Sequence, residues 1–205
     1  MIVIGGTQRS GTSLLTTFVK DYGFNVGTDF WHQDINGGLE SPIICNYISK
    51  KMNLKEFPFK SFNKIKHNTI YEPEIVIQKF SFLLMDSRFI KHLSVLYPDL
   101  KLLITQRNED KVIKSKKSTP EREKRFKGDH PILKQSSKEL KTSKRKAIKE
   151  IQKRRIQNEQ VEFDDIINKP KKVVEKLNLL GLGIDLDKSL NIFNRIIDKT
   201  KITIK

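Results

Sequence analysis

Small residues and one cation form a loop near the start of the chain that could bind an anion. Residues 5–13 read Gly-Gly-Thr-Gln-Arg-Ser-Gly-Thr-Ser, with Arg9 as the single charge. Glycine lets a backbone approach a ligand closely, while hydroxyl and backbone N–H groups donate hydrogen bonds to anion oxygens. We therefore predict a phosphate or sulfate site whose ligands come from this loop: Gly6, Arg9, Ser10, Gly11, Thr12 and Ser13.

The segments on either side of the loop favour the same function. A run of β-favouring residues at 2–4, Ile-Val-Ile, stops at the glycines. Apolar residues at helical spacing follow the loop: Leu14, Leu15, Phe18 and Val19. A strand, a glycine turn and a helix together aim the positive end of the helix dipole at a bound anion.

The spacing of the loop separates it from a loop that binds nucleoside triphosphates. Gly6 and Gly11 have the Walker A spacing, but Thr12 and Ser13 follow where that motif has a lysine and then Ser or Thr. A P-loop kinase-like enzyme is therefore the alternative rather than the first interpretation. Residues 9–14, Arg-Ser-Gly-Thr-Ser-Leu, instead resemble the 5′-phosphosulfate loop of the sulfotransferases.

This resemblance implies both a donor and a reaction. The donor is 3′-phosphoadenosine 5′-phosphosulfate, and the product carries its sulfuryl group on a hydroxyl or an amine. Arg9 takes the catalytic position beside the bridging oxygen of the donor. The resemblance implies no metal, and the sequence has no close cluster of His, Cys, Asp and Glu at ligand spacing.

A second pair of residues supports the resemblance. Residues 100–107, Leu-Lys-Leu-Leu-Ile-Thr-Gln-Arg, have the pattern of a buried strand that ends in Arg107, and a polar helix is expected over 111–117. The sulfotransferases place an arginine there and a serine eight residues later, here Ser115, and both bind the 3′-phosphate of the donor. An arginine suits that role because its guanidinium offers two parallel hydrogen bonds. Asn108 and Glu109 depart from the Asn/Asp-Pro that often follows this arginine.

The order of the predicted elements indicates an α/β fold. A strand at 75–79, a helix at 87–97 and a strand at 101–105 form a βαβ unit, which places parallel strands in one sheet. Residues 161–182 resemble the closing element of the sulfotransferases. We predict a single sulfotransferase-like domain over 1–205, with a mainly parallel central sheet of four or five strands flanked by helices, a P-loop-like three-layer sandwich.

The base that takes the proton of the acceptor has more than one candidate in the sequence. In the sulfotransferases it is a histidine or a glutamate, and Glu40 stands roughly where the glutamate branches place theirs. His32 and His67 are the rivals, although the histidine motif that follows the second strand is missing. Lys79 matches a basic residue that the family often has at that strand end.

The positive charge is concentrated in one region. Residues 111–160 hold 18 Lys and Arg against 6 Asp and Glu. We predict a basic helical insertion over about 118–160, in which Ser136 and Glu139 form a capping box for a helix from 138 to about 160. Its apolar stripe would leave cationic clusters at 144–146 and 153–155 in water. This charge fits a solvated face, a guide for anions, or sequence-independent nucleic-acid binding, of which the last is disfavoured.

Composition sets the remaining expectations. The chain has 205 residues, a formal net charge of +16 and one cysteine, Cys45, which we predict to be a buried thiol. It has no apolar run of membrane-spanning length and no signal peptide pattern, so we expect a cytoplasmic protein.

The acceptor is expected to be a small molecule or a carbohydrate, neutral or anionic. A non-catalytic basic protein that binds nucleotides or nucleic acid is the other alternative. The tail is predicted to be helical from 190, with a β-like end at 201–204.

Overall fold

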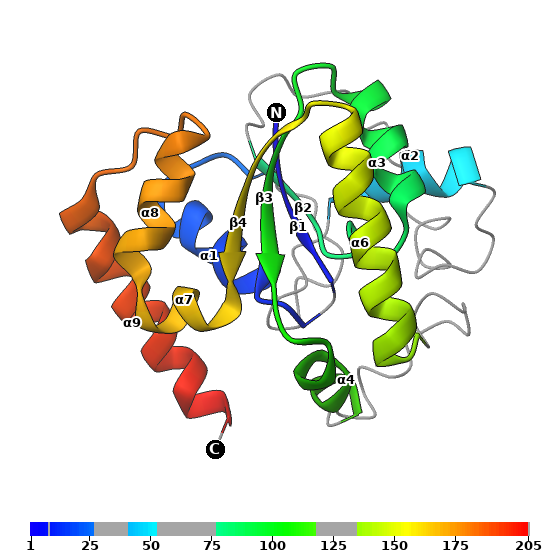
Figure 1. Ribbon diagram of the computed structural model, residues 1–205. Coiled ribbons are helices and arrows are strands. Elements are labelled where there is room, and N and C mark those ends of the chain that lie inside the picture. The colour runs from blue at the N-terminus through cyan, green and yellow to red at the C-terminus, as the bar shows by residue number, and fades with distance from the viewer. Residues whose placement is uncertain (8, 27–40, 53–76, 118–134, 205) are drawn as a thin grey trace.

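A parallel sheet forms the centre of the computed structural model, which describes residues 1–7, 9–26, 41–52, 77–117 and 135–204. Four strands lie in the order β2-β1-β3-β4, and all three pairings are parallel (Figure 1). This confirms the predicted α/β fold with a mainly parallel sheet and the strands expected at 2–4, 75–79 and 101–105, of which residues 75 and 76 lie outside the described ranges. The strands are β1 (Ile2–Gly6), β2 (Ile77–Phe80), β3 (Lys101–Gln106) and β4 (Gln157–Glu162).

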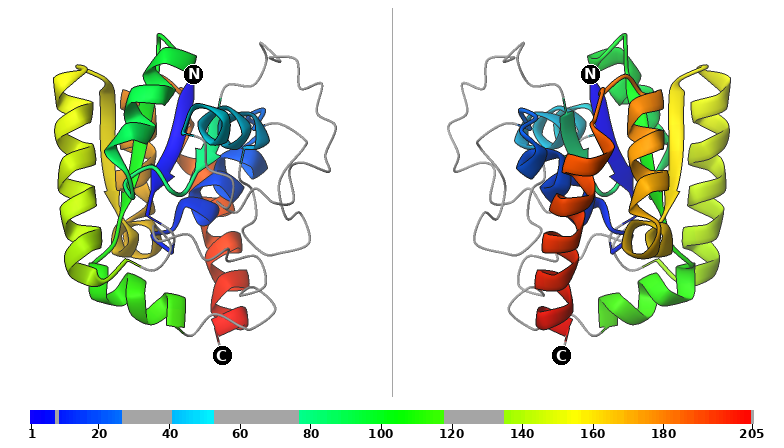
Figure 2. Two further views of the ribbon diagram at one scale, coloured as in Figure 1. Left: turned by 90° about the vertical axis from the view of Figure 1, so that its right-hand side faces the viewer. Right: turned by 90° about the vertical axis from the view of Figure 1, so that its left-hand side faces the viewer.

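Helices cover both faces of the sheet because side chains of successive strand residues point to opposite faces. Val3 joins the core beneath one helical layer, while Ile2 and Ile4 join the core beneath the other. The two views of Figure 2 look onto these two layers in turn. The first layer contains α2 (Pro42–Met52), α3 (Ser87–Leu96), α4 (Glu109–Lys117) and α6 (Ser137–Lys153). The second contains α1 (Thr12–Tyr22), α7 (Phe163–Asn168), α8 (Pro170–Leu179) and α9 (Leu186–Ile204).

The basic helix α6 begins where the sequence predicted and ends earlier. Ser136 and Glu139 form the expected capping box, and Leu140, Ala147 and Ile151 are buried in the core. The helix stops at Lys153 rather than near residue 160, because Arg155 adopts a left-handed backbone with φ of 54° and turns the chain into β4. Residues 137–153 are thus the crossover helix that leads to the edge strand of the sheet.

Two cations that we expected in water, Lys144 of α6 and Arg154 at its C-cap, turn inward instead. The side chain of Lys144 is 16% exposed and pairs with Glu109 of α4 at 2.9 Å. Arg154 pairs with Glu150 at 2.6 Å and donates to Ser94 Oγ at 3.0 Å. Lys144 thus links α6 to α4, while Arg154 links the end of α6 to α3 and to the last turn of α6 itself.

The C-terminal segment corrects another expectation. Residues 201–204 continue α9, and the β-like end predicted for them is wrong. Phe193 of this helix stacks on Phe18 of α1 with ring centroids 3.8 Å apart. The packing of an amphipathic helix against a neighbouring helix favours helical structure more strongly than the β propensity of its last residues opposes it.

Two further predictions concerned the environment of Cys45 and the presence of membrane-spanning helices. Cys45 is a buried free thiol on α2, as predicted. Within the described ranges, no helix combines the length and apolar content that crossing a bilayer requires.

Candidate functional site

The loop between β1 and α1 has the geometry of an anion site. Gly11 is the N-cap of α1 with a left-handed φ of 98°, and the first turn of the helix contains no acidic residue. The first N–H groups of a helix have no partner within it and carry the positive end of its dipole. The first turn of α1 itself therefore presents no carboxylate that would compete with a bound anion.

Gly6 is required because two hydroxyls crowd the space that a side chain would take. A Cβ at this position would lie 2.3 Å from Thr105 Oγ1 and 2.5 Å from Ser10 Oγ. Those hydroxyls contact each other at 2.6 Å, and Ser10 also donates to the carbonyl of Thr7 at 2.6 Å. Gly6 thus lets the loop close against β3.

The hydroxyl of Ser10 shapes the loop from inside. Ser10 is fully buried, and its backbone N–H as well as its hydroxyl donates to the carbonyl of Thr7. Thr105, its partner on β3, was not among the predicted site residues. Its signal in the sequence was a hydroxyl within a buried strand, which alone does not reveal a partner in a loop 95 residues away.

Lys79 reaches the same loop from the end of β2. Its side chain is almost completely buried, and its Nζ donates to Ser13 Oγ in the first turn of α1 at 2.8 Å. β2 pairs with β1 in parallel, so its carboxyl end lies beside the beginning of the loop. A lysine ammonium is therefore held next to the N-terminus of α1.

The structure brings Arg9, Arg107 and Ser115 together. Arg9 Nε donates to Ser115 Oγ at 3.2 Å, and Arg107 Nη1 donates to the carbonyl of Arg9 at 3.1 Å. The strand register explains the meeting, because Gly6 lies opposite Thr105 and both strands end at the same edge. The two motifs of the sequence, about a hundred residues apart along the chain, thus form one cluster.

Arg107 has a donor that lacks an acceptor. Its Nε is buried and finds no hydrogen-bond acceptor among the residues that the structure describes, while its guanidinium lies 4.2 Å from the centre of the Phe163 ring. Burial lowers the pKa of Arg107, as does the charge of Arg9, and Asp164 opposes this. A buried donor without a partner costs free energy, and an anion oxygen would satisfy it.

Phe163 is a site residue that the sequence analysis did not assign. It begins α7, stacks on Arg107, and lies so close to Gly11 that a Cβ there would be 2.8 Å from its ring. One aromatic ring therefore orients the arginine and limits the N-cap of α1 to glycine.

Helix α4, which carries Ser115, is fixed at its beginning. The side chain of Asn108 accepts from the N–H of Asp110 at 3.0 Å and from that of Lys111 at 3.3 Å. Ser137 Oγ donates to Asp110 Oδ1 at 2.7 Å, and Lys144 pairs with Glu109. Asn108 and Glu109, the departure from the family pattern, thus give a capped helix that is held by α6.

The candidate bases lie outside the described residues: Glu40, His32 and His67. The next described residue after Glu40 is Ser41, whose N–H donates to the carbonyl of Lys79 at 3.0 Å. Its hydroxyl donates to Gln78 Oε1 at 2.8 Å. The beginning of α2 is therefore anchored to the carboxyl end of β2.

Among described residues, no three His, Cys, Asp or Glu side chains group as a metal site would require.

Comparison with solved structures places this fold among known ones. The chain is similar to the sulfotransferase domain from the olefin synthase of Synechococcus PCC 7002, with 19% identity, a TM-score of 0.54, and coverage of 93% of this chain and 75% of that one. It is also similar to the sulfotransferase domain from the curacin biosynthetic pathway, with 15% identity, a TM-score of 0.50, and coverage of 90% and 75%. No protein-family model and no curated protein matches the chain. The likeness confirms the sulfotransferase fold that the two motifs predicted.

Proposed function

We propose that this chain with the sulfotransferase fold is an enzyme that uses 3′-phosphoadenosine 5′-phosphosulfate. One observation carries the proposal: Lys79 contacts the first turn of α1, while Arg9 and Arg107, from the loops that follow β1 and β3, meet beside Ser115 of α4. Arg107 also keeps a buried donor without an acceptor. A ligand with two separate anionic groups fits this arrangement better than a single phosphate does.

The two anionic groups of the donor would bind at different parts of the cluster. The 5′-phosphosulfate would lie against residues 6–13, with hydrogen bonds from the first turn of α1, where Thr12 and Ser13 stand. The 3′-phosphate would accept from Arg107 and from Ser115. Ser10 would act through the shape of the loop, because its own donors are already engaged.

The reaction needs positive charge on the leaving oxygen and a base for the acceptor. The acceptor oxygen or nitrogen forms a bond to sulfur while the bond from sulfur to the bridging oxygen breaks. 3′-Phosphoadenosine 5′-phosphate leaves with the electron pair. Arg9 and Lys79 would stabilise the negative charge that develops on that oxygen. A base takes the proton of the acceptor, and we assign this role to Glu40, with His32 as the rival.

Glu40 is favoured by its place in the chain. It directly precedes Ser41, which is hydrogen-bonded to Lys79, and Lys79 contacts the loop. A base must come within hydrogen-bond reach of the proton that it removes. The acceptor class that we propose is a small molecule or a carbohydrate with a hydroxyl or an amine.

Calorimetry with 3′-phosphoadenosine 5′-phosphate tests the donor site. We expect micromolar binding, which Arg9→Ala and Arg107→Ala each weaken by about tenfold or more. Arg88→Ala is the matched control, since Arg88 pairs with Asp86 at the start of α3 and takes no part in the cluster. Tighter binding of ATP with magnesium, or unchanged binding in Arg107→Ala, would refute the donor site and favour the kinase-like alternative.

A transfer assay tests the base separately. We expect Glu40→Gln to bind 3′-phosphoadenosine 5′-phosphate like the unmodified protein and to lose transfer by about a hundredfold or more. His32→Ala is expected to retain most of the transfer. The opposite pattern would assign the base to His32.

A further inference from the structure

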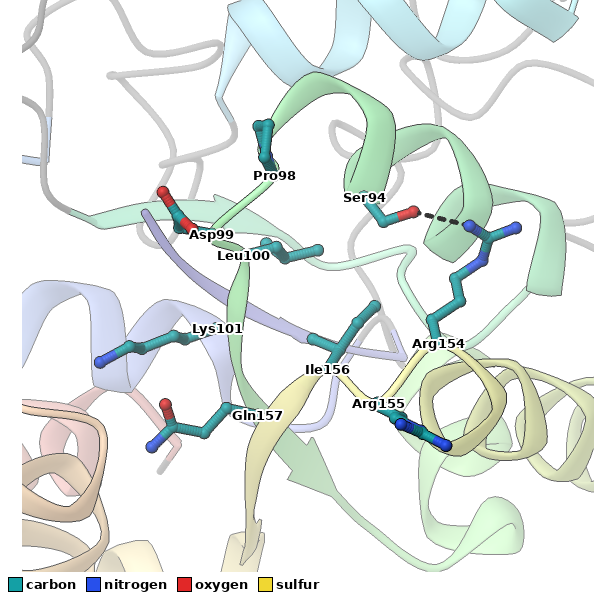
Figure 3. A pocket seen from close by; sticks show the side chains of 9 residues that line it. All are labelled: Ser94, Pro98, Asp99, Leu100, Lys101, Arg154, Arg155, Ile156 and Gln157. Atoms are coloured by element: carbon teal, nitrogen blue, oxygen red, sulfur yellow. Dashed lines mark hydrogen bonds between the residues drawn. The ribbon is translucent and has the colours of Figure 1, made fainter.

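A hollow lies at the end of the sheet opposite to the loop. It has a volume of about 530 Å³ and is open to solvent at the amino ends of β3 and β4 (Figure 3). The loop lies at the carboxyl ends of the strands, roughly 17 Å away along β3. The lining residues relevant here are Ser94, Leu100, Lys101, Arg154, Arg155 and Ile156.

The hollow has a mixed lining, in which the apolar side chains of Leu100 and Ile156 lie among polar and charged residues, Asp99 included. Leu100 is almost completely buried and Ile156 is half-buried, so both present only part of their surface. Among the residues that the structure describes, the large hydrophobic side chains that are well exposed are Val95 (64%) and Leu179 (63%). Val95 follows the lining residue Ser94, and the carbonyl of Leu179 accepts from the side chain of Gln157, another lining residue. Single exposed apolar residues are ordinary, and these two neighbour lining residues along the chain or through a hydrogen bond without lining the hollow themselves.

The outer face of α6 carries unbalanced positive charge, and the C-terminal end of this helix meets the hollow. Six of its cations are exposed, and within the described chain none of them has an ion-pair partner: Lys138, Lys141, Arg145, Lys146, Lys149 and Lys153. Glu139 is used in the capping box, and Glu150 pairs with Arg154. A surface of a single sign attracts a partner of the opposite sign.

Arg155 stands where this charged face meets the hollow. It lines the hollow and is exposed, and its left-handed backbone closes the end of α6 (Figure 3). Glycine is the usual residue at this position of a helix end, because a Cβ is disfavoured there. The chain thus keeps an arginine where the backbone favours glycine.

We propose that this end of the molecule binds an acidic segment of a partner protein that carries an apolar side chain. The apolar side chain would enter the hollow over Leu100 and Ile156. Carboxylates on either side of it would pair with Arg155 and with the exposed cations of α6. An apolar anchor in a pocket with charged groups around it is the usual arrangement of peptide recognition.

Two other classes of polyanion fit the described surface less well. A single-stranded nucleic acid bound without sequence preference is held by aromatic side chains as well as by cations, and α6 has no aromatic residue. A duplex would bind to the cations through its phosphates alone and would leave the hollow unused. Insertion into an anionic membrane needs apolar side chains on the outer face of the helix, whereas those of α6 face the core.

Fluorescence anisotropy with a labelled peptide tests the proposal. The probe is Glu-Glu-Leu-Glu-Glu-Leu-Glu-Glu, and its control has serine in place of both leucines. We expect the leucine peptide to bind at least about fivefold more tightly, because it alone fills the hollow. Arg155→Gly should weaken its binding by about fivefold or more without loss of thermal stability, since glycine relieves the strained backbone. This variant therefore separates lost binding from lost folding.

Lys171→Gln is the matched control for charge. Lys171 is an exposed lysine of α8 without an ion pair in the described chain, and its replacement should change binding by less than about twofold. Equal effects of Arg155→Gly and Lys171→Gln, or equal binding of the two peptides, would overturn the proposal. Tighter, Arg155-dependent binding of duplex DNA or of phosphatidylglycerol vesicles would overturn it in favour of that polyanion. Because the donor site lies at the other end of the sheet, calorimetry with 3′-phosphoadenosine 5′-phosphate should be unchanged in Arg155→Gly.

Discussion

Arg107 is organised for a ligand before the ligand arrives. Phe163 supports one face of its guanidinium, the carbonyl of Arg9 accepts from one of its nitrogens, and its Nε is buried without an acceptor. Groups that are held in position need little reorganisation when charge is bound, which is the basis of electrostatic preorganisation. The free-energy penalty of the unsatisfied Nε–H is then removed only when a bound ligand accepts its hydrogen bond.

Lys79 gives the sharpest prediction at the scale of a residue. Lys79→Met keeps the length of the side chain and removes the ammonium that donates to Ser13. We expect transfer to fall by about a hundredfold while the free energy of unfolding stays the same or rises, because a buried charge is removed. A steady-state transfer assay and a thermal melt check the two parts.

Lys101→Met is the control for this substitution. Lys101 also lies on the sheet, but at the amino end of β3, where its Nζ donates to the carbonyl of Leu180. Its loss should leave transfer within about twofold. If Lys79→Met were as active as Lys101→Met, the assigned role of Lys79 would be wrong.

The sequence alone does not show which contacts each of the similar hydroxyl side chains of the loop makes. Ser10 and Ser13 are both small hydroxyl residues of the same motif, yet Ser10 is fully buried against Thr105 and Ser13 contacts Lys79. Those partners lie 95 and 66 residues away. Local sequence predicts that a hydroxyl is present, and only the strand order decides what it contacts.

Elements with clear end signals were predicted well, and a polar strand was not. Ser136 and Glu139 fixed the beginning of α6 because a capping box is a local interaction. β4 reads Gln-Asn-Glu-Gln-Val-Glu and has only Val161 buried, so it shows no alternation of apolar residues. It forms at the edge of the sheet by pairing with β3, which a local pattern does not record.

The ion pair between α4 and α6 gives a prediction at the scale of an element. Burial alone would raise the pKa of Glu109, but the hydrogen bond and charge of Lys144, a backbone hydrogen bond and the charge of Lys141 together outweigh it, and the pKa lies below its ordinary value. A carboxyl with a lowered pKa stabilises the fold above the pKa of its unfolded form, about 4.3, and loses this as the pH falls further.

Glu109→Gln should therefore lower the free energy of unfolding by about 1–2 kcal/mol at neutral pH. The difference from the unmodified protein should shrink as the pH falls below about 4. Urea unfolding at a series of pH values measures it. Glu175→Gln, at an exposed position of α8, is the control and should cost less than about 0.5 kcal/mol at any pH. A difference for Glu109→Gln that stays constant with pH would exclude the ion pair as its source.

At the scale of the whole molecule, the two ends of one parallel sheet have different functions in our proposals. The carboxyl ends of β1, β2 and β3 supply the loop, Lys79 and Arg107, as is usual for ligand sites in open α/β sheets. The amino ends supply the hollow beneath the end of α6. Helix α6 runs between these two ends, and within the described chain six of its exposed cations have no ion-pair partner.

Because the donor site joins segments from distant parts of the chain, its occupation should stabilise the entire fold. A ligand that binds only the folded state at a hundred times its dissociation constant adds about 2.7 kcal/mol. For a domain of this size that corresponds to a rise in Tm of roughly 5–10 °C. We expect 3′-phosphoadenosine 5′-phosphate to give this rise and AMP, which lacks the 3′-phosphate, to give much less at the same concentration.

Arg107→Ala should abolish the difference between the two nucleotides, since Arg107 is the assigned ligand of that phosphate. Equal stabilisation by AMP in the unmodified protein would mean that the cluster of Arg9, Arg107 and Ser115 does not recognise a second phosphate.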